Sequence, residues 1–195
     1  MINKLKLSQG LNILSGYKKG YKTSFVLKWA NYLAKDNKVL YINWAKQESV
    51  FTDRLKEMGE EVNPNMVIDS LYEYLDATAS IEIFEKIENE KFDIIFFDDI
   101  IVNSDRNYED EYFKYCGDVA MVLDFIANRL KIKIVLTISV KQQSKLTDIL
   151  ISQKIRKLSK QIYVIQAQHE LGSGLRNKYE FNIFSMNNKA IKQIL

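Results

Sequence analysis

Short apolar runs alternate with stretches of helical periodicity along most of this chain. The apolar runs predict strands or extended pieces at residues 11–15, 38–43, 66–69, 93–98 and 132–138. Apolar positions at helical spacing predict helices at residues 23–35, 48–58, 79–89 and 110–130, and a helix or part of one at 147–158. The sequence therefore predicts an α/β fold with a mainly parallel central sheet and helices on both of its faces.

The C-terminal part of the pattern differs, because no helix is expected between its strands. Strands are predicted at residues 161–166 and 178–185, with a last short one at 190–195. Strands that follow one another directly pair most readily as antiparallel neighbours. We therefore expect an antiparallel extension at one edge of the sheet.

The composition agrees with this fold class and limits the number of domains and the chemistry of cysteine and histidine. The chain has 195 residues, 47% of them apolar, and only one proline and seven glycines, so a single domain over residues 1–195 is expected. Its 28 basic and 25 acidic residues leave a net charge of +3, which does not by itself indicate a nucleic-acid partner. The single cysteine, Cys116, excludes an internal disulfide and is expected to be a packed thiol, and the single histidine, His169, cannot form a histidine-based zinc site alone.

The sequence carries no apolar run of transmembrane length, so no membrane partner is expected. Its first ten residues, MINKLKLSQG, lack the apolar core of a signal peptide. The expected location is therefore the cytoplasm.

Glycines, lysines and hydroxyl residues follow the first predicted strand, in the segment GYKKGYKTS at residues 16–24. The phosphate-loop pattern is G-x-x-x-x-G-K-[ST], in which backbone N–H groups and a helix N-terminus hold phosphates and a lysine reaches the terminal ones. Tyr21 stands where the pattern has glycine before the lysine, and a side chain there resists close approach of phosphate. The expected nucleotide-binding residues are Gly16, Lys19, Gly20, Tyr21, Lys22, Thr23 and Ser24. The alternative is an ordinary strand–helix turn with surface lysines.

A second feature typical of nucleotide-binding sites is the acidic end of the strand at 93–98. Its last residue, Asp98, is followed by Asp99. A carboxylate at the tip of a buried strand beside a phosphate loop can hold a magnesium ion together with a loop hydroxyl. We therefore expect Thr23 and Asp98 to bind Mg²⁺ and Asp99 to lie near the attacking water. The expected cofactors are ATP and Mg²⁺, if the loop is competent to bind phosphate. The alternative is that the aspartates simply begin a polar loop.

Taken together, these segments resemble the RecA-type motor domain of DnaB-like replicative helicases, over nearly the whole chain. The resemblance implies a RecA-like P-loop fold and an ATPase acting in DNA replication or recombination. It places the phosphate loop in residues 10–34 and the magnesium strand in DIIFFDD. The stretch 117–143 resembles the family's long helix and the strand that ends in a Ser-Gln sensor. Ser139 matches that serine, whereas the glutamine is shifted to Gln142 or Gln143.

The resemblance also implies two catalytic positions, both of which depart from the family's pattern. The family's water-activating glutamate falls at about Ala45 here, so Glu48, three residues on, is the candidate base. Arg176, in the segment GLRN, matches the arginine that reaches a neighbouring subunit's nucleotide, although the family's lysine before it is missing. Such an arginine implies a homo-oligomer, either a ring or a filament. The other expected partners are a replication protein and DNA, single-stranded rather than double-stranded.

Three functional hypotheses follow. The first is a nucleotide-binding ATPase with weak or lost hydrolysis. The second is an inactive RecA-fold subunit that serves DNA binding or assembly, which Tyr21 and the missing glutamate favour. The third is an unrelated small P-loop kinase. For the DNA-binding forms, the candidate phosphate contacts are Lys141, Lys145, Lys154, Arg156 and Lys157.

Overall fold

The fold consists of five helices and eight strands in the part of the chain that the structure describes. That structure is a computed structural model, and it describes residues 5–17, 22–44, 47–71, 77–98, 109–140, 153–169, 179–187 and 190–193. The helices are α1 (Lys22–Leu33), α2 (Glu48–Glu57), α3 (Ala77–Glu90), α4 (Glu109–Leu130) and α5 (Gln153–Leu158). The strands are β1 (Gly10–Tyr17), β2 (Val39–Trp44), β3 (Met66–Leu71), β4 (Ile94–Asp98), β5 (Lys133–Val140), β6 (Gln161–His169), β7 (Tyr179–Asn187) and β8 (Ala190–Gln193).

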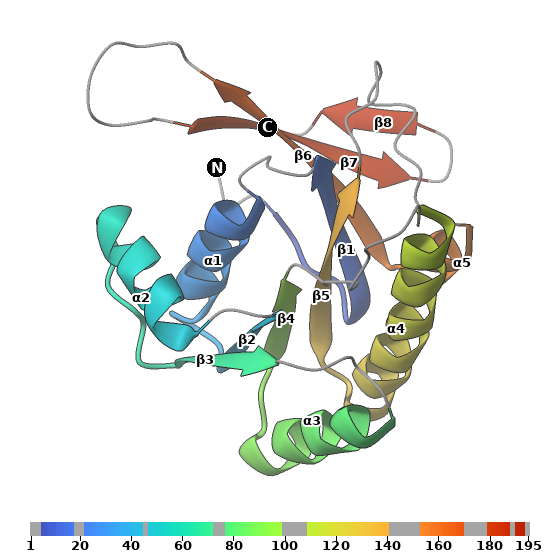
Figure 1. The fold of residues 1–195 in the computed structure, drawn as a ribbon, viewed down its shortest axis with the longest axis horizontal. Coiled ribbons are helices and arrows are strands. Elements are labelled where there is room, and N and C mark those ends of the chain that lie inside the picture. Colours follow the sequence, from blue (N-terminus) through green and yellow to red (C-terminus); the bar gives the residue numbers. More distant parts are fainter. Residues whose placement is uncertain are drawn as a thin grey trace.

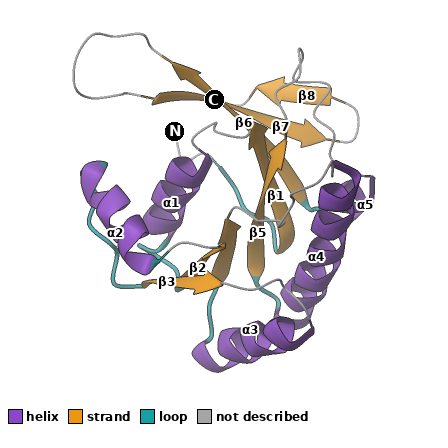
Figure 2. Cartoon of the chain, viewed as in Figure 1, coloured by secondary structure: helices purple, strands orange, loops and turns teal. Residues whose placement is uncertain are grey.

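All eight strands form one sheet in the order β3-β2-β4-β5-β1-β6-β7-β8. The six strands from β3 to β6 are parallel, and helices cover them, which confirms the predicted α/β class with a mainly parallel sheet (Figure 1). Beyond β6, the strand β7 pairs antiparallel with both β6 and β8. Figure 2 shows the same alternation of strands and helices that the hydrophobic pattern predicts.

Each helix connects two strands of the sheet, and the face on which it packs depends on whether the second strand lies nearer the β3 edge or farther from it. Helices α1 and α2 lead toward the β3 edge and pack on one face, whereas α3, α4 and α5 lead the opposite way and pack on the other. This division follows from the right-handed connection between parallel strands, which puts opposite directions of travel on opposite faces. The face that carries α1 and α2 is called the α1 face, and the face that carries α3, α4 and α5 is called the α4 face.

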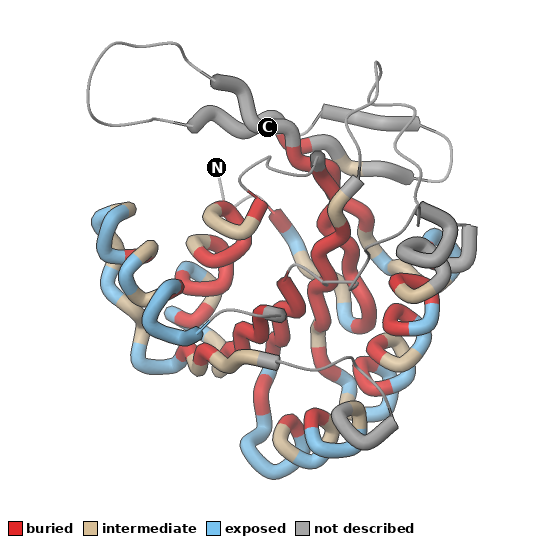
Figure 3. The backbone as a smooth tube through the Cα atoms, viewed as in Figure 1, coloured by how far each residue is buried: buried red, intermediate tan, exposed pale blue. Residues whose placement is uncertain are grey.

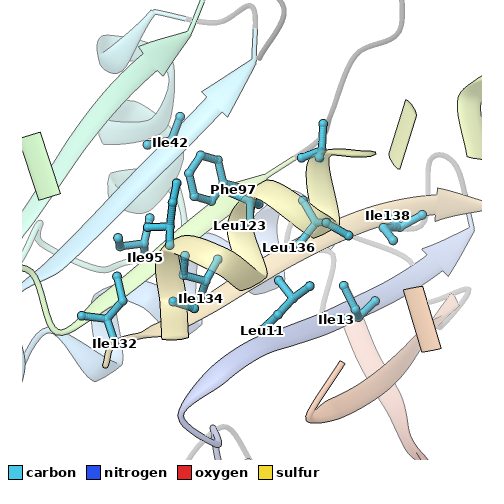
Figure 4. Packing of buried hydrophobic residues seen from close by; sticks show 14 of the residues in the cluster. Leu11, Ile13, Ile42, Ile95, Phe97, Leu123, Ile132, Ile134, Leu136 and Ile138 are labelled. Atoms are coloured by element: carbon cyan, nitrogen blue, oxygen red, sulfur yellow. The ribbon is translucent and has the colours of Figure 1, made fainter. Parts of the chain in front are cut away.

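Apolar side chains fill both faces of the sheet, so the strands are buried while the outer sides of the helices are exposed (Figure 3). On the α4 face, side chains of β1, β4 and β5 such as Leu11, Phe97 and Leu136 pack against Leu123 of α4 (Figure 4). Cys116 belongs to the same cluster and is fully buried, as predicted for a packed thiol. Burial on both faces explains why β4 is apolar throughout.

Helices α3 and α4 both end in a left-handed lysine. Lys91 has φ 55° and Lys131 has φ 56°, in the region that glycine adopts at most helix ends of this kind. The turn at Lys131 is closed by the Ile132 N–H, which donates to the Ala127 carbonyl oxygen at 3.1 Å. Each lysine therefore carries backbone strain that a glycine would not.

Replacing Lys131 with glycine is expected to raise the free energy of unfolding by about 0.5–1 kcal/mol, because the left-handed conformation costs an L-residue about 1–2 kcal/mol and glycine's greater chain entropy offsets part of that gain. Urea denaturation monitored by circular dichroism measures the change. Lys133→Gly, on β5 and outside the left-handed region, should instead destabilise the protein. Equal losses for the two variants would contradict the assignment of strain to Lys131.

Candidate functional site

The candidate site lies at the carboxyl edge of the parallel sheet. The chain leaves β1 toward α1 on one face, whereas β5 is followed by α5 on the other. The neighbouring strands β2 and β4 diverge in the same manner, toward α2 and α4. Such divergence opens a crevice at the carboxyl ends of parallel strands, where the ligands of open α/β sheets bind.

Lys22 is the first residue of α1 and is only 7% exposed. Its stem lies against Gly16 near the end of β1, because a Cβ on Gly16 would stand 3.0 Å from Lys22 Cδ and 2.8 Å from the Ile165 carbonyl oxygen. Any side chain at residue 16 would therefore displace the lysine or the backbone of β6. Glycine at this position is required chiefly by the close approach of the Ile165 carbonyl oxygen, and the Lys22 stem fills the remaining space.

The N-terminus of α1 can face an anion. Its first turn contains no acidic residue, and the helix is 12 residues long, so its partial positive charge is not offset locally. Thr23 and Ser24 lie in this turn and are half-buried. Lys22, Thr23 and Ser24 thus lie together in the first turn of α1. Lys19, Gly20 and Tyr21 lie outside the described residues.

Asp98 is the last residue of β4 and is fully buried. Its Oδ2 atom accepts a hydrogen bond from the Tyr41 hydroxyl at 2.6 Å, and its Oδ1 atom accepts one from the Thr137 hydroxyl at 2.8 Å. These partners come from β2 and β5, the two strands that flank β4. A buried carboxylate held by hydroxyl donors on both oxygens has a fixed orientation, which is useful in a site that positions a hydrated cation.

Asn43 completes this polar cluster. Its Nδ2 atom donates to the main-chain oxygen of Asp98 at 3.2 Å, and the two residues are paired across β2 and β4. Asn43 is 2% exposed, yet its Oδ1 atom has no hydrogen-bond partner among the described residues. A buried acceptor without a partner costs about 1–3 kcal/mol, so this oxygen fits a site that receives a donor such as a water molecule.

The carboxyl ends of β1 and β4 are close enough for one ligand to meet both. Gly16 pairs with Ser139 of β5, and β5 is the only strand between β1 and β4. Two strand spacings and a two-residue offset put the Cα atoms of Gly16 and Asp98 roughly 10–12 Å apart. Alternation along the strands places Gly16, Asp98 and Thr137 on the α1 face, the face on which Lys22 begins its helix. This arrangement fits the phosphates of a nucleotide with a magnesium ion.

The two catalytic candidates are not brought into this cluster by the described residues. Glu48 is the first residue of α2 and is exposed at the carboxyl edge of the sheet. Arg176 and Asp99 lie outside the described residues, as do Lys141 and Lys145. Arg156 and Lys157 are exposed on the short helix α5, in which Lys154 also lies.

Tyr41, Asn43 and Thr137 were not anticipated as site residues. A signal for two of them is present in the sequence, since Asn43 and Thr137 are polar positions near the ends of the otherwise apolar runs KVLYIN and IKIVLTI. Period-two alternation would have put both on one face of the sheet. Their convergence on Asp98 requires the strand order, which periodicity does not supply.

Comparison with models of known protein families gave no match, and no curated protein matched the sequence. Within the described ranges, no helix is both long and apolar enough to cross a membrane. The same part of the chain contains no cluster of three carboxylate, thiol or imidazole side chains that would hold a metal ion by itself. Magnesium needs only one or two protein carboxylates when a substrate supplies phosphate oxygens, so the expected pair of Thr23 and Asp98 does not require such a cluster.

Proposed function

We propose that this chain is a RecA-like P-loop domain that binds ATP with Mg²⁺ and acts in DNA replication or recombination, in the manner of DnaB-like helicase motors with weak or lost hydrolysis. The observation that carries the proposal is the buried Lys22 at the start of α1, folded against Gly16 on the same face as Asp98. Lysine, glycine and acidic strand end are the three parts that phosphate and magnesium binding require.

The sheet supports the RecA-like form of the proposal. The resemblance needs the loop strand, the sensor strand and the magnesium strand to share one edge. Here β1, β5 and β4 are consecutive neighbours, and Ser139 of β5 pairs with Gly16 of β1. Ser139 is half-buried beside the proposed phosphate site, where a sensor of the terminal phosphate would lie.

In this proposal each group has a limited task. Lys22 and the α1 N-terminus hold the negative phosphates, and Thr23 and Asp98 hold the magnesium ion, whose charge neutralises that of the phosphates when it is bound. Tyr41 and Thr137 orient the Asp98 carboxylate through the two hydrogen bonds that they donate. Asn43 offers its unpartnered oxygen to water at the same edge.

Of the steps in this proposal, ATP hydrolysis has the least support from the described residues. The family's water-activating glutamate has no counterpart in the cluster, and Glu48 is exposed in the first turn of α2. General-base catalysis requires hydrogen-bond reach to the attacking water. The competing function, an inactive RecA-fold subunit for DNA binding or assembly, is favoured by this feature together with Tyr21. A contribution of Arg176 to a neighbouring subunit's site in a ring or filament belongs to the same proposal.

The decisive experiment measures binding of ATP to the purified chain by calorimetry, with and without Mg²⁺, and then phosphate release with and without single-stranded DNA. Magnesium-dependent binding is expected, with little or no turnover. Turnover stimulated by DNA would establish a working motor instead. Absence of binding to any nucleoside triphosphate would overturn the nucleotide-binding proposal and leave the assembly role.

Tyr21→Gly is expected to raise the affinity for MgATP by about fivefold, equivalent to about 1 kcal/mol, because it restores the glycine that the phosphate loop requires before its lysine. Calorimetric titration of the variant and the parent chain measures the change. Tyr21→Phe keeps the ring and should leave the affinity unchanged. A loss of affinity in the glycine variant would show that Tyr21 contributes to binding.

A further inference from the structure

A row of lysines lies at the amino edge of the sheet, opposite the proposed nucleotide site. Lys91 follows α3 and precedes β4, Lys131 follows α4, Lys133 begins β5, and Lys160 precedes β6. In Figure 1 helices α3 and α4 both end at the lower edge of the sheet, next to the first residues of β4 and β5. These four residues are called the amino-edge lysine row.

The row borders a groove of about 410 Å³. Lys91, Lys131 and Lys133 line this groove, together with apolar side chains that include Phe92 and Leu130. Lys91 and Lys131 are exposed and Lys133 is half-exposed. Three cationic side chains from two helix ends and one strand thus meet at one concave surface.

Lys160 extends the row across β1. The Cγ and Cε atoms of its stem lie 3.0 and 3.1 Å from the position of a Cβ on Gly10, so the stem crosses the start of β1. Gly10 has φ +102° and pairs with Lys133 on the other side. The glycine therefore allows Lys160 to lie over β1, toward the strand that carries Lys133.

The charges of the row are not neutralised within the described residues. None of its four lysines forms an ion pair there, whereas Lys38, at the same edge, pairs with Glu90 at 3.8 Å. The main-chain N–H of Lys38 donates to Asp93 Oδ2 at 2.8 Å, and this neutral donor leaves the negative charge of Asp93 in the groove. Glu88 is the other acidic side chain of the groove, and the negative ends of α3 and α4 add about half a charge each. Against Asp93, Glu88 and these two helix ends, the four lysines leave the row with an excess of about one positive charge.

Backbone strain gives a second, independent reason to assign a role to this row. Lys91 and Lys131 occupy left-handed positions where glycine or asparagine is cheaper. Both helix ends nevertheless carry a lysine, and both lysines border the same groove. Strained residues of this kind cluster at functional sites. The competing explanation is that each lysine only offsets the partial negative charge of its helix C-terminus. In that case, replacing the lysines would change the stability of the fold and nothing else.

We propose that the amino-edge lysine row binds the phosphodiester backbone of a nucleic-acid strand. The row crosses β4, β5, β1 and β6, and three strand spacings make it about 15 Å long. A line of cations of that length matches a linear polyanion with regularly spaced phosphates, whereas a single phosphate ion would need a point cluster. Contacts of this kind are independent of sequence. The surface is separate from the nucleotide site and does not need ATP.

The test uses fluorescence anisotropy of a labelled oligothymidylate longer than the typical site of about 4–16 nucleotides, without nucleotide, between about 50 and 200 mM salt. The variant is K91Q/K131Q/K133Q. Each lost phosphate contact removes about 0.7 from the slope of log affinity against log salt, so the slope should fall by about 2 and the affinity at low salt by about 10- to 100-fold. Lysine-to-arginine changes at the same residues should preserve binding.

The matched control is K28Q/R54Q/K56Q, which removes three positive charges from α1 and α2. This control should bind like the parent chain, and an equal loss would overturn the proposal in favour of net charge. An unchanged slope in the row variant, or equally tight binding to vesicles rich in phosphatidylserine, would also overturn it. Because Lys22→Ala should leave this binding intact, failure of the nucleotide site and failure of the row are distinguishable.

Discussion

Replacing Lys22 with alanine is expected to weaken MgATP binding by about 10- to 100-fold, the loss that follows from removing a charged hydrogen bond of about 1.5–3 kcal/mol. The residue begins α1 and is buried against Gly16, so its ammonium group can reach a ligand only at the carboxyl edge of the sheet. Calorimetric titration with ATP and Mg²⁺ measures the loss.

Lys28→Ala is the matched control, since Lys28 lies on the same helix with its side chain 44% exposed and paired with Glu60. That variant should bind MgATP like the parent chain. Circular dichroism and the urea midpoint of each variant establish that the domain is folded. Unchanged affinity in a folded Lys22→Ala variant would place any nucleotide elsewhere and would contradict the proposed site.

The elements of the fold were predictable from the sequence because each strand and helix has a local hydrophobic signature. The predicted strand at 132–138 corresponds to β5, and the predicted helix at 110–130 corresponds to α4, with boundaries shifted by one or two residues. The order of the strands was not predictable. A strand buried on both faces, such as β4, carries no periodicity that tells which strand lies on either side. That information resides in long-range packing and in the handedness of the connections.

The candidate site also has parts that follow from local sequence patterns and parts that depend on the strand order. The local phosphate-loop pattern indicates Gly16, Lys22 and Thr23, and the acidic end of the fourth strand indicates Asp98. The structure brings Lys22 and Asp98 to one edge and one face. The hydroxyl donors to Asp98 were not predictable, because they depend on the register of β4 with its two neighbours. The lysine row escaped sequence analysis for a similar reason. Its members are scattered along the chain and meet only because parallel strands begin at one edge.

The two edges of the sheet therefore have different chemical characters. The carboxyl edge combines the α1 N-terminus with a buried carboxylate, a pairing that suits phosphate together with a cation. The amino edge combines helix C-termini with exposed lysines. The positive charge that remains after the lysines offset the negative helix ends suits an extended anion. A nucleotide site and a strand-binding surface on opposite edges would be linked through β4 and β5.

Asp98→Ala is expected to lower the free energy of unfolding by about 2–5 kcal/mol. The change removes the acceptor of the Tyr41 and Thr137 hydroxyls, and each buried donor that loses its acceptor costs about 1–3 kcal/mol. Urea denaturation at constant pH measures the loss. A whole domain is stable by only about 5–15 kcal/mol, so this single change consumes a large share of the total.

Asp98→Asn separates the structural task of the residue from its proposed ligand task. The amide keeps the volume and one acceptor oxygen, and a hydroxyl can rotate to accept from its NH₂ group, so the loss of stability should be within about 2 kcal/mol. The negative charge is absent, so the dependence of ATP binding on Mg²⁺ should disappear. Thr137→Val, which removes one donor and retains the charge, should keep that dependence. If Asp98→Asn binds ATP with the same magnesium dependence as the parent chain, Asp98 holds the fold together and has no part in the metal site.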